Sequence, residues 1–551
     1  MSLRTCLTTI FIVAILGASL RAQTPPHLWS QRFGNTFKDG GYGVAVDALW
    51  NVVVTGEFQG TVDLGGGNLV SAGGSDIFVA KYDASGTWQW SQRFGSLSDD
   101  AGRRVAVDAS GNVVVTGSFQ GTVNFGGGDL VSAGGSDIFV AKYDANGAHQ
   151  WSQRFGGTGG DYGGDVAVDA AGNVVVTGVF HDTVNFGGGN LVSSGDYDIF
   201  VAKYDASGAH QWSHSAGSTV EDFGAGIAVD AAGNVLVSGY FQGTVNFGGG
   251  DLVSAGAEDI FLAKYNASGA WQWSQRFGST GGDYGGGVAV DASANVVVTG
   301  GFQGTVDFGG GNLTAGGLDL YVAKYDSSGA HQWSQNFGST NANYGHNVAV
   351  DGSGNVVVTG EFQATVDFGG GNLMSAGGYD IFVAKYDSSG VHQWSQHAGS
   401  TAEDYGADVA VDAAGNAVVT GVFQGTVDFG GGNLVSAGGY EIFVAKYGST
   451  VTGILDSPRR HGLVVHTYPN PFNPAATITY SVPSAGMVDL RVYDLQGRLL
   501  RTLVSETKTV GEHFETWDGR DENGIAVASG IYFLRLESGG YVRTRKIVLI
   551  K

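Results

Sequence analysis

The chain has 551 residues, 95 of them Gly and only 7 Pro, and its 51 acidic side chains against 28 basic ones give a formal charge of -23. Such a charge cannot neutralise nucleic-acid phosphates, which excludes nucleic acid as an expected partner. The glycine content, with plentiful Val, Thr and aromatic residues, favours strands joined by tight turns over a helical fold.

Residues 1–22 have the pattern of a secretory signal peptide. Arg4 supplies the positive start, residues 7–17 form the apolar run, and Ala22 precedes the expected cleavage point. No other segment approaches the roughly 20 apolar residues that a membrane-spanning helix needs, so none is expected in the mature chain. Cys6 is the only cysteine and lies within the signal. The mature protein is therefore expected to be secreted without disulfides.

Seven tandem repeats follow the signal. The Trp of the motif W-S-Q-R-F-G marks their starts, which are spaced by 61 residues with one spacing of 60: Trp29, Trp90, Trp151, Trp212, Trp273, Trp333 and Trp394. Each unit carries four short segments, V-A-V-D, N-V-V-V-T-G, D-I-F-V-A-K-Y-D and W-S-Q-R-F-G, rich in β-branched and aromatic residues and separated by turn signals. Seven units of four strands predict a seven-bladed β-propeller over residues 27–449, with a β-solenoid as the alternative.

The phase of the repeats predicts how the ring closes. If V-A-V-D is the innermost strand of a blade and W-S-Q-R-F-G the outermost, the seventh blade starts at Val409 and lacks its fourth strand after Tyr447. The missing strand is present at the other end of the chain, in residues 27–34. We therefore expect the N-terminal segment to complete the last blade, which leaves no unpaired edge.

The repeated motifs "VAVDASGNVVVTG" and "DIFVAKYDASG" resemble the bacterial SBBP-type β-propeller repeat and, more distantly, NHL repeats. This resemblance covers residues 27–449 and implies a fold, with no catalytic residues and no particular ligand. The chain departs from the short form of the repeat by an added T-V-[DN]-F-G-G-G-[ND]-L-V-S segment between the second and third strands. Its near-constant length predicts an ordered hairpin around Gly65, Gly66 and Gly67 in the first unit.

The connections that leave the second strand and those that join successive blades are both long, and they emerge on one face of the ring. Because binding residues concentrate on loops held by a rigid scaffold, this long-loop face is the candidate binding surface. One column lies five residues ahead of the inner strand: Asp39, Asp100, Asp161, Asp222, Asp283, Asn343 and Asp404. In four units Tyr follows it: Tyr162, Tyr284, Tyr344 and Tyr405.

Two interpretations of this column stay open. A ring of oxygen-bearing side chains near the channel mouth is suited to Ca²⁺ or to the hydroxyl groups of a glycan beside the tyrosines. Alternatively, each side chain caps its own loop by accepting backbone N–H bonds. No cofactor is required by either interpretation, and the twelve His residues show no zinc spacing.

Further charged residues recur once per blade. Seven lysines, of which Lys81 is the first, and seven aspartates that end the inner strands, of which Asp47 is the first, are expected to form structural ion pairs, with Asp76 and its equivalents as competing partners. Arg103, Arg104, His181, Asp182 and His346 break the repeat. These departures indicate either one specialised sector or drift between duplicated units.

We expect no catalysis, because the sequence shows no nucleophile elbow, no sialidase-type turn and no selected pair of carboxylates. The alternative function is that of a secreted carbohydrate-active enzyme with carboxylates on the long-loop face. Residues 23–451 hold 14 basic and 41 acidic side chains, a charge of about -27 that solubility alone explains.

The composition changes near Gly448, where a linker over residues 450–466 leads to a second domain over residues 467–551. Six apolar runs separated by turns predict a small β-sandwich there: residues 478–482, 488–493, 499–504, 513–517, 531–536 and 546–550. The segments "YPNPFNP", "VYDLQGR" and "WDGRDENGIAVASGIYFLRL" closely resemble the type A C-terminal sorting domain of type IX secretion, which has a FlgD-like Ig fold. An ordinary Ig module that mediates contacts is the alternative.

Together these features predict an all-β protein with a seven-bladed propeller of four-stranded blades and an Ig-like C-terminal domain. From the long-loop face we expect a binding or scaffold module whose partner is an extracellular glycan or protein. The resemblance of the C-terminal domain implies the type IX secretion machinery as a second partner, and secretion or display on the outer-membrane surface of a Gram-negative-type bacterium.

Overall fold

The computed structural model describes residues 25–449, 464–468, 472, 475–482, 486–495, 497–509, 511–538 and 541–550. The predicted signal and most of the predicted linker lie outside the described residues. The chain divides into two compact units, residues 1–451 and 452–551. No helix long and apolar enough to cross a membrane is found in the part of the chain that the structure describes.

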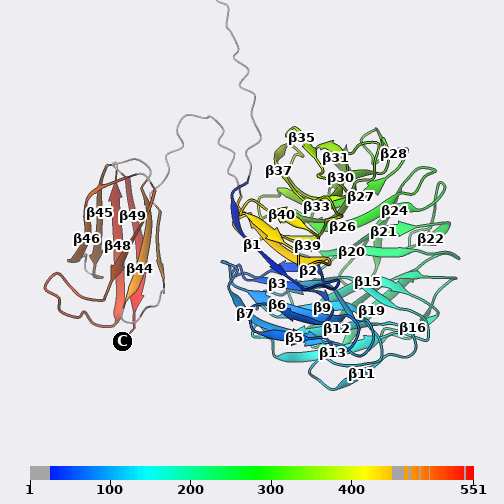
Figure 1. Ribbon diagram of the computed structural model, residues 1–551, viewed down its shortest axis with the longest axis horizontal. Coiled ribbons are helices and arrows are strands. Elements are labelled where there is room, and N and C mark those ends of the chain that lie inside the picture. Colours follow the sequence, from blue (N-terminus) through cyan, green and yellow to red (C-terminus); the bar gives the residue numbers. More distant parts are fainter. Residues whose placement is uncertain are drawn as a thin grey trace, which may run out of the picture. The chain divides into compact units, whose positions relative to one another are not determined.

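The first unit contains seven four-stranded antiparallel sheets (Figure 1). In six of them the strands lie side by side in chain order, with a separate short hairpin between the second and third strands. Their innermost strands are β2 (Gly40–Val46), β8 (Ala101–Val107), β14 (Tyr162–Val168), β20 (Phe223–Val229), β26 (Tyr284–Val290), β32 (Tyr344–Val350) and β38 (Tyr405–Val411). The second strands are β3 (Val52–Phe58), β9 (Val113–Phe119), β15 (Val174–Phe180), β21 (Val235–Phe241), β27 (Val296–Phe302), β33 (Val356–Phe362) and β39 (Ala417–Phe423).

The third strands are β6 (Asp76–Tyr82), β12 (Asp137–Tyr143), β18 (Asp198–Tyr204), β24 (Asp259–Tyr265), β30 (Asp319–Tyr325), β36 (Asp380–Tyr386) and β42 (Glu441–Tyr447). The outermost strands are β7 (Trp88–Phe94), β13 (His149–Phe155), β19 (His210–Ala216), β25 (Trp271–Phe277), β31 (His331–Phe337), β37 (His392–Ala398) and, for the seventh blade, β1 (His27–Phe33). The predicted order of strands within a blade is therefore confirmed.

The predicted closure of the ring is also confirmed. Strand β1 pairs antiparallel with β42, with Ser30 opposite Ala445 and Gln31 opposite Val444, so the last blade has the order β1-β42-β39-β38. In Figure 1 the dark blue β1 lies beside the yellow strands of the last blade. The separate four-stranded sheets exclude the alternative β-solenoid.

The added segment of each repeat forms the predicted short hairpin. Its strands are β4 (Thr61–Asp63) with β5 (Asn68–Val70), β10 (Thr122–Asn124) with β11 (Asp129–Val131), β16 (Thr183–Asn185) with β17 (Asn190–Val192), β22 (Thr244–Asn246) with β23 (Asp251–Val253), β28 (Thr305–Asp307) with β29 (Asn312–Thr314), β34 (Thr365–Asp367) with β35 (Asn372–Met374), and β40 (Thr426–Asp428) with β41 (Asn433–Val435). In the first hairpin Gly65 and Gly66 lie against Trp88, and an added Cβ at Gly66 would come within 2.1 Å of its ring.

The hydrophobic core of the propeller lies between neighbouring blades. Seven buried clusters occupy the seven interfaces, including the one between the last blade and the first. Strand periodicity explains why each sheet contributes to two of them, since successive side chains point to opposite faces. In β3, Val52 and Val54 join the cluster with blade seven, whereas Val53 joins the cluster with blade two.

The second unit consists of two antiparallel sheets. One contains β43 (Val464–Tyr468), β44 (Ala476–Val482) and β47 (Gly511–Trp517), and the other contains β45 (Gly486–Tyr493), β46 (Leu499–Lys508), β48 (Gly530–Ser538) and β49 (Tyr541–Leu549). Their apolar faces form a single cluster around the fully buried Trp517. The predicted sandwich is thus confirmed, but β43 begins within the segment predicted as linker, so that boundary was placed too late.

Candidate functional site

The long-loop face is held together by bonds between successive blades. The amide of Asp100, which precedes β8, donates to the carbonyl of Ser75 in the preceding blade (2.8 Å), and Asp39 N donates to Tyr440 O in the same way (2.9 Å). The loop that enters each blade is therefore fixed to the long connection of its neighbour. This arrangement gives the face a rigid backbone on which side chains can be presented.

The predicted ring of seven residues lies beneath this surface. All seven side chains are fully buried: Asp39, Asp100, Asp161, Asp222, Asp283, Asn343 and Asp404. Each Asp accepts two backbone N–H bonds; for Asp39 the donors are Asn35 N (2.8 Å) and Gln59 N (2.9 Å). Burial outweighs these bonds and raises the pKa of Asp39, Asp100, Asp161 and Asp222 to about 6. The contacts are those of the loop-capping interpretation.

Asn343 keeps one of these two contacts with a neutral side chain and replaces the other by a bond that it donates. Its Oδ1 accepts from Gln363 N (3.1 Å) and its Nδ2 donates to Asn341 O (2.9 Å). Among the described residues, no three His, Cys, Asp or Glu side chains are grouped so as to hold a metal ion. Binding of Ca²⁺ therefore remains a prediction without a cluster to support it.

The four tyrosines of the predicted ring are in unequal surroundings. Tyr162 is 39% exposed and packs beside Tyr197, and Tyr344 packs beside His346 with 4.9 Å between ring centroids. Tyr284 lines a cavity of about 390 Å³, which also contains Tyr240 and the acidic residues Asp196, Glu221 and Glu258. Tyr405 lines a larger cavity, so the seven blades do not present equivalent sites.

The larger cavity, of about 520 Å³, lies where the inner strands of blades six, seven, one and two begin. We call it the mouth cavity. It is lined by Lys38, Tyr42, Arg103, Arg104, His346, Glu361, Tyr405, Ala407, Val422 and Tyr440. Arg103, Arg104 and His346 were noted in the sequence because they break the repeat, and the fold brings all three together. His181 and Asp182 are not part of its lining.

Contacts among the lining residues fix their positions. The guanidinium of Arg103 lies over the ring of Tyr42, 4.9 Å from its centroid, and the Tyr42 hydroxyl donates to Glu57 Oε1 (2.7 Å). On the opposite side, His346 Nε2 and Glu361 Oε2 are 2.5 Å apart. The aromatic and charged groups of the cavity are thus held by one another.

The next position of the inner strand, that of Arg104, carries four polar side chains into the channel: Arg104, Asp165, Asn347 and Asp408. Asp408 accepts from the amide of Val44 in blade one (2.7 Å) and from Asn347, while Asp165 accepts from the amide of Ile227 in blade four (2.8 Å). Burial raises the pKa of Asp165 to about 7, an effect that the charge of Arg104 opposes. These side chains tie neighbouring blades together below the mouth cavity.

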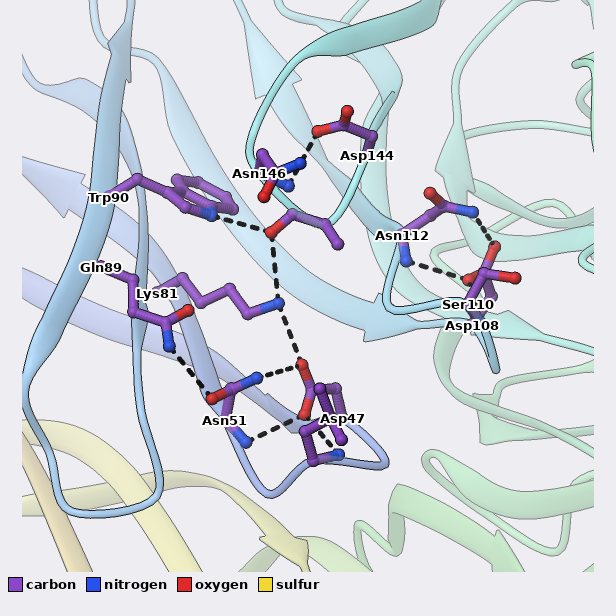
Figure 2. A network of polar contacts seen from close by, with 12 residues as sticks. Asp47, Asn51, Lys81, Gln89, Trp90, Asp108, Ser110, Asn112, Asp144 and Asn146 are labelled. Carbon is purple, nitrogen blue, oxygen red and sulfur yellow. Dashed lines mark hydrogen bonds and ion pairs between the residues drawn. The ribbon is translucent and has the colours of Figure 1, made fainter. Parts of the chain in front are cut away.

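The repeated lysines form the predicted structural ion pairs, and the structure resolves which acid each one meets. Lys81 Nζ lies 2.9 Å from Asp47 Oδ2, both side chains are buried, and the same ammonium donates to Ala145 O of the next blade (3.3 Å; Figure 2). Six equivalent pairs join the third and first strands of the other blades. Asp76 and two equivalents pair instead with an outer-strand arginine, and Glu441 pairs with Arg32.

Several residues of the mouth cavity were not identified from the sequence, namely Lys38, Tyr42, Glu361 and Tyr440. A signal for two of them was present. Tyr42 occupies a position that is Gly or Ala in four other repeats, and Glu361 one that is Ser, Val, Tyr or Gly in five. Reading each column for its exceptions would have found them, but only the ring closure shows that blades six, seven, one and two meet there.

Comparisons with known proteins bear on the two units separately. The model of the FlgD Ig-like domain family matches residues 474–540. An uncharacterized WD repeat-containing protein of Acanthamoeba polyphaga mimivirus is 24% identical over 545 residues, which cover 78% of this chain and 39% of that protein. The chain thus spans less than half the length of that relative.

Two solved structures are similar over most of the chain. Puromycin hydrolase has a TM-score of 0.41 at 10% identity, covering 83% of this chain and 62% of the other. PorZ, a surface component of the type IX secretion system of Porphyromonas gingivalis, has a TM-score of 0.25 at 13% identity, covering 93% and 81%. The second unit is thus similar to the FlgD Ig-like family, and the closed ring of four-stranded sheets makes the first unit a β-propeller.

Proposed function

We propose that the chain is a secreted or surface-displayed binding protein whose ligand site is the mouth cavity of the propeller. The observation that carries this proposal is the asymmetry of the cavity. Three of its lining residues, Arg103, Arg104 and His346, break the repeat, and they converge on one sector of an otherwise sevenfold scaffold. Drift between duplicated units would scatter such departures around the ring, as His181 illustrates.

The size and composition of the cavity suit a small ligand. A volume of about 520 Å³ lies in the range of about 300–1,000 Å³ that is typical of ligand pockets. Tyr42, Tyr405 and Tyr440 offer aromatic surface, and charged groups surround them. An extracellular glycan is the ligand class that we favour, because aromatic faces and converging polar groups are what saccharide rings require.

We propose binding without catalysis. The carboxylates at the cavity already have partners. Glu57 accepts from the hydroxyl of Tyr42, and Glu361 pairs with the ring of His346. Neither is a free acid or base for hydrolysis of a glycosidic bond. Analysis of the recovered glycans by mass spectrometry tests this point, since cleavage products would contradict it.

A matched pair of variants tests the location of the site. Tyr405 and Tyr162 occupy the same position of the repeat, but only Tyr405 lines the mouth cavity. On a glycan array, Tyr405→Ala is expected to lose binding at least tenfold, whereas Tyr162→Ala is expected to bind like the parent. Equal losses in both variants would favour the predicted sevenfold ring over a single site, and an array without any binder would contradict the proposal.

For the second unit we propose a role as the export signal of type IX secretion. The match to the FlgD Ig-like family supports the fold that this role requires, and the resemblance to type A sorting domains supports the role itself. Residues 452–551 fused to a periplasmic reporter are expected to bring it to the surface of a bacterium that has this secretion system. Retention in the periplasm, with the fusion intact and folded, would contradict the role.

A further inference from the structure

The cationic residues of the propeller are distributed in a way that singles out the mouth cavity. Of the 14 Lys and Arg residues in residues 25–449, all of which the structure describes, seven lysines and four arginines belong to the repeated ion pairs described above. Three remain: Lys38, Arg103 and Arg104. All three line the mouth cavity, on a propeller with a charge of about -27.

Within the described propeller, Arg103 and Lys38 have no carboxylate closer than 3.9 Å, whereas the charge of Arg104 acts on the buried Asp165 and Asp408 and opposes the rise in their pKa values. Arg103 is exposed and makes no ion pair within 4 Å, and its guanidinium rests on the face of Tyr42. Lys38 is 65% exposed, and its nearest carboxylate, that of Glu57, is 3.9 Å away. Arg104 donates to backbone carbonyls, among them Ala407 O at 3.4 Å, while its buried Nε has no hydrogen-bond partner in the structure.

The other blades show that this charge is local. At the position of Arg103 the six remaining repeats carry Tyr42, Gly164, Ala225, Gly286, His346 and Ala407. At the position of Arg104 they carry Gly, Asp or Asn. Two adjacent guanidinium groups therefore occur in one blade alone. They form a patch of positive electrostatic potential on a propeller that is otherwise acidic.

The charged groups around the cavity favour a carboxylate over a phosphate as the bound anion. Guanidinium groups bind carboxylates and phosphates in a planar, bidentate manner. Glu361 lines the cavity and Glu57 holds Tyr42 at its edge, so a doubly charged phosphate would meet two carboxylates. A singly charged carboxylate meets less repulsion, and neighbouring hydroxyl groups of the same ligand can donate to Glu57 and Glu361.

We propose that the mouth cavity binds an acidic saccharide, with the carboxylate of a uronic acid unit held by Arg103 and Lys38 and its ring lying against Tyr405 and Tyr440. This inference rests on the proposed function, because it names the ligand class of the same cavity. Arg104 supplies positive charge from below, where its backbone contacts fix it. The hydroxyl groups of the sugar face the carboxylates on either side.

The test is calorimetric titration of the full chain with galacturonic acid trimer, with the fully methyl-esterified trimer, and with galactose trimer. We expect the acid to bind, and the ester and the neutral sugar to bind at least tenfold more weakly. Arg103→Gln is expected to reduce affinity for the acid at least tenfold and to leave the melting temperature unchanged, because the side chain is exposed. Arg103→Lys keeps the charge but not the forked guanidinium group, and its affinity for the acid is expected to lie between those of the parent and Arg103→Gln.

The outcomes separate this inference from the proposed function. One outcome is that the neutral trimer binds, that Tyr405→Ala abolishes this binding and that Arg103→Gln does not. This outcome would overturn the acidic-ligand inference alone. Binding of inorganic phosphate or of a peptide through its C-terminal carboxylate, but not of the uronate, would overturn the saccharide class. If no saccharide on an array binds and the uronate trimer gives no heat at millimolar concentration, both proposals fail.

Discussion

At the scale of single residues, the Lys81–Asp47 pair and its six equivalents place two buried charges of opposite sign in contact in every blade. Burial alone would raise the pKa of Asp47, but bonds from Asn51 and Lys81 outweigh burial and hold the pKa below its ordinary value. Lys81→Met leaves a buried carboxylate without its cation. We expect it to lower the free energy of unfolding by about 3 kcal/mol, the usual cost of breaking a buried pair.

Urea unfolding followed by tryptophan fluorescence measures this effect, since ten of the eleven tryptophans lie in the propeller. Lys38→Met is the matched control. It removes the same kind of charge from an exposed pair at 3.9 Å, and such pairs contribute about 0–1 kcal/mol. Equal losses in the two variants would show that the buried pair has no special role in stability.

Gly66 provides a second prediction at this scale. A Cβ there would lie 2.1 Å from Cζ2 of Trp88, whose indole covers the hairpin. We expect Gly66→Ala to displace the indole and to lower the free energy of unfolding by about 1–2 kcal/mol, the range typical of overpacking. In the Trp88→Ala background the same substitution should cost little, because the clash is gone. A cost that persists in that double variant would point to the backbone.

At the scale of elements, the closure by β1 depends on a pairing between the two ends of the propeller. Ser30 and Ala445 face each other in this pairing and are both small, so cysteines fit at these positions. We expect the oxidised Ser30→Cys, Ala445→Cys protein to unfold at a higher temperature than its reduced form. The gain should be about 2–4 kcal/mol, because the bond closes almost the whole propeller into one loop.

Differential scanning calorimetry of the oxidised and reduced forms measures the gain, and each single-cysteine variant serves as the control. Failure of the two cysteines to join in the folded protein would contradict the pairing. A disulfide that forms without raising the melting temperature would show that the ends of the ring do not limit its unfolding.

The blades were predictable from the sequence because the same strand and turn motifs recur in all seven repeats. The phase of the repeat also predicted that β1 replaces the missing strand after Tyr447, and β1 does pair with β42. Strand β43 was not predicted, since residues 450–466 were interpreted as a linker and the strand begins at Val464. Its membership in a sheet depends on pairing with β44, a contact that local composition does not encode.

At the scale of the whole molecule, the mouth cavity is a product of ring closure. Arg103 in blade two and Glu361 in blade six are far apart in the sequence, and only the circular arrangement brings both to the cavity. Arg103 was recognised in the sequence as an exception within the repeat, but Glu361 was not. The sequence predicted seven blades and their closure, but it did not show that these two side chains line one cavity, because that depends on how the side chains pack.

The dependence of stability on pH is also a property of the whole ring. Burial raises the pKa of Asp39, Asp100, Asp161 and Asp222 to about 6, above the ordinary value of 3.8. Between these two values the folded protein binds more protons at these sites than the unfolded chain. Stability from these sites therefore rises as the pH falls from about 7 to about 4.

Other groups act in the opposite direction. Burial lowers the pKa of His149, His210, His392 and His397, which weakens the fold as the pH falls through about 6.5. The aspartates that pair with the buried lysines have lowered pKa values, so their stabilisation is lost below the ordinary value of 3.8. We expect these contributions to place the greatest stability of the propeller between about pH 4 and pH 6.

Blade six offers the natural control for this prediction, because Asn343 fills the same position without a charge. We expect Asp161→Asn to gain on the parent as the pH rises from 5 to 7.5, by on the order of 1 kcal/mol, since the parent alone must deprotonate a buried carboxyl group there. Melting temperatures of both proteins across this range measure the difference. A difference that stays constant with pH would mean that Asp161 is already ionised at pH 5 and that its two backbone bonds outweigh its burial.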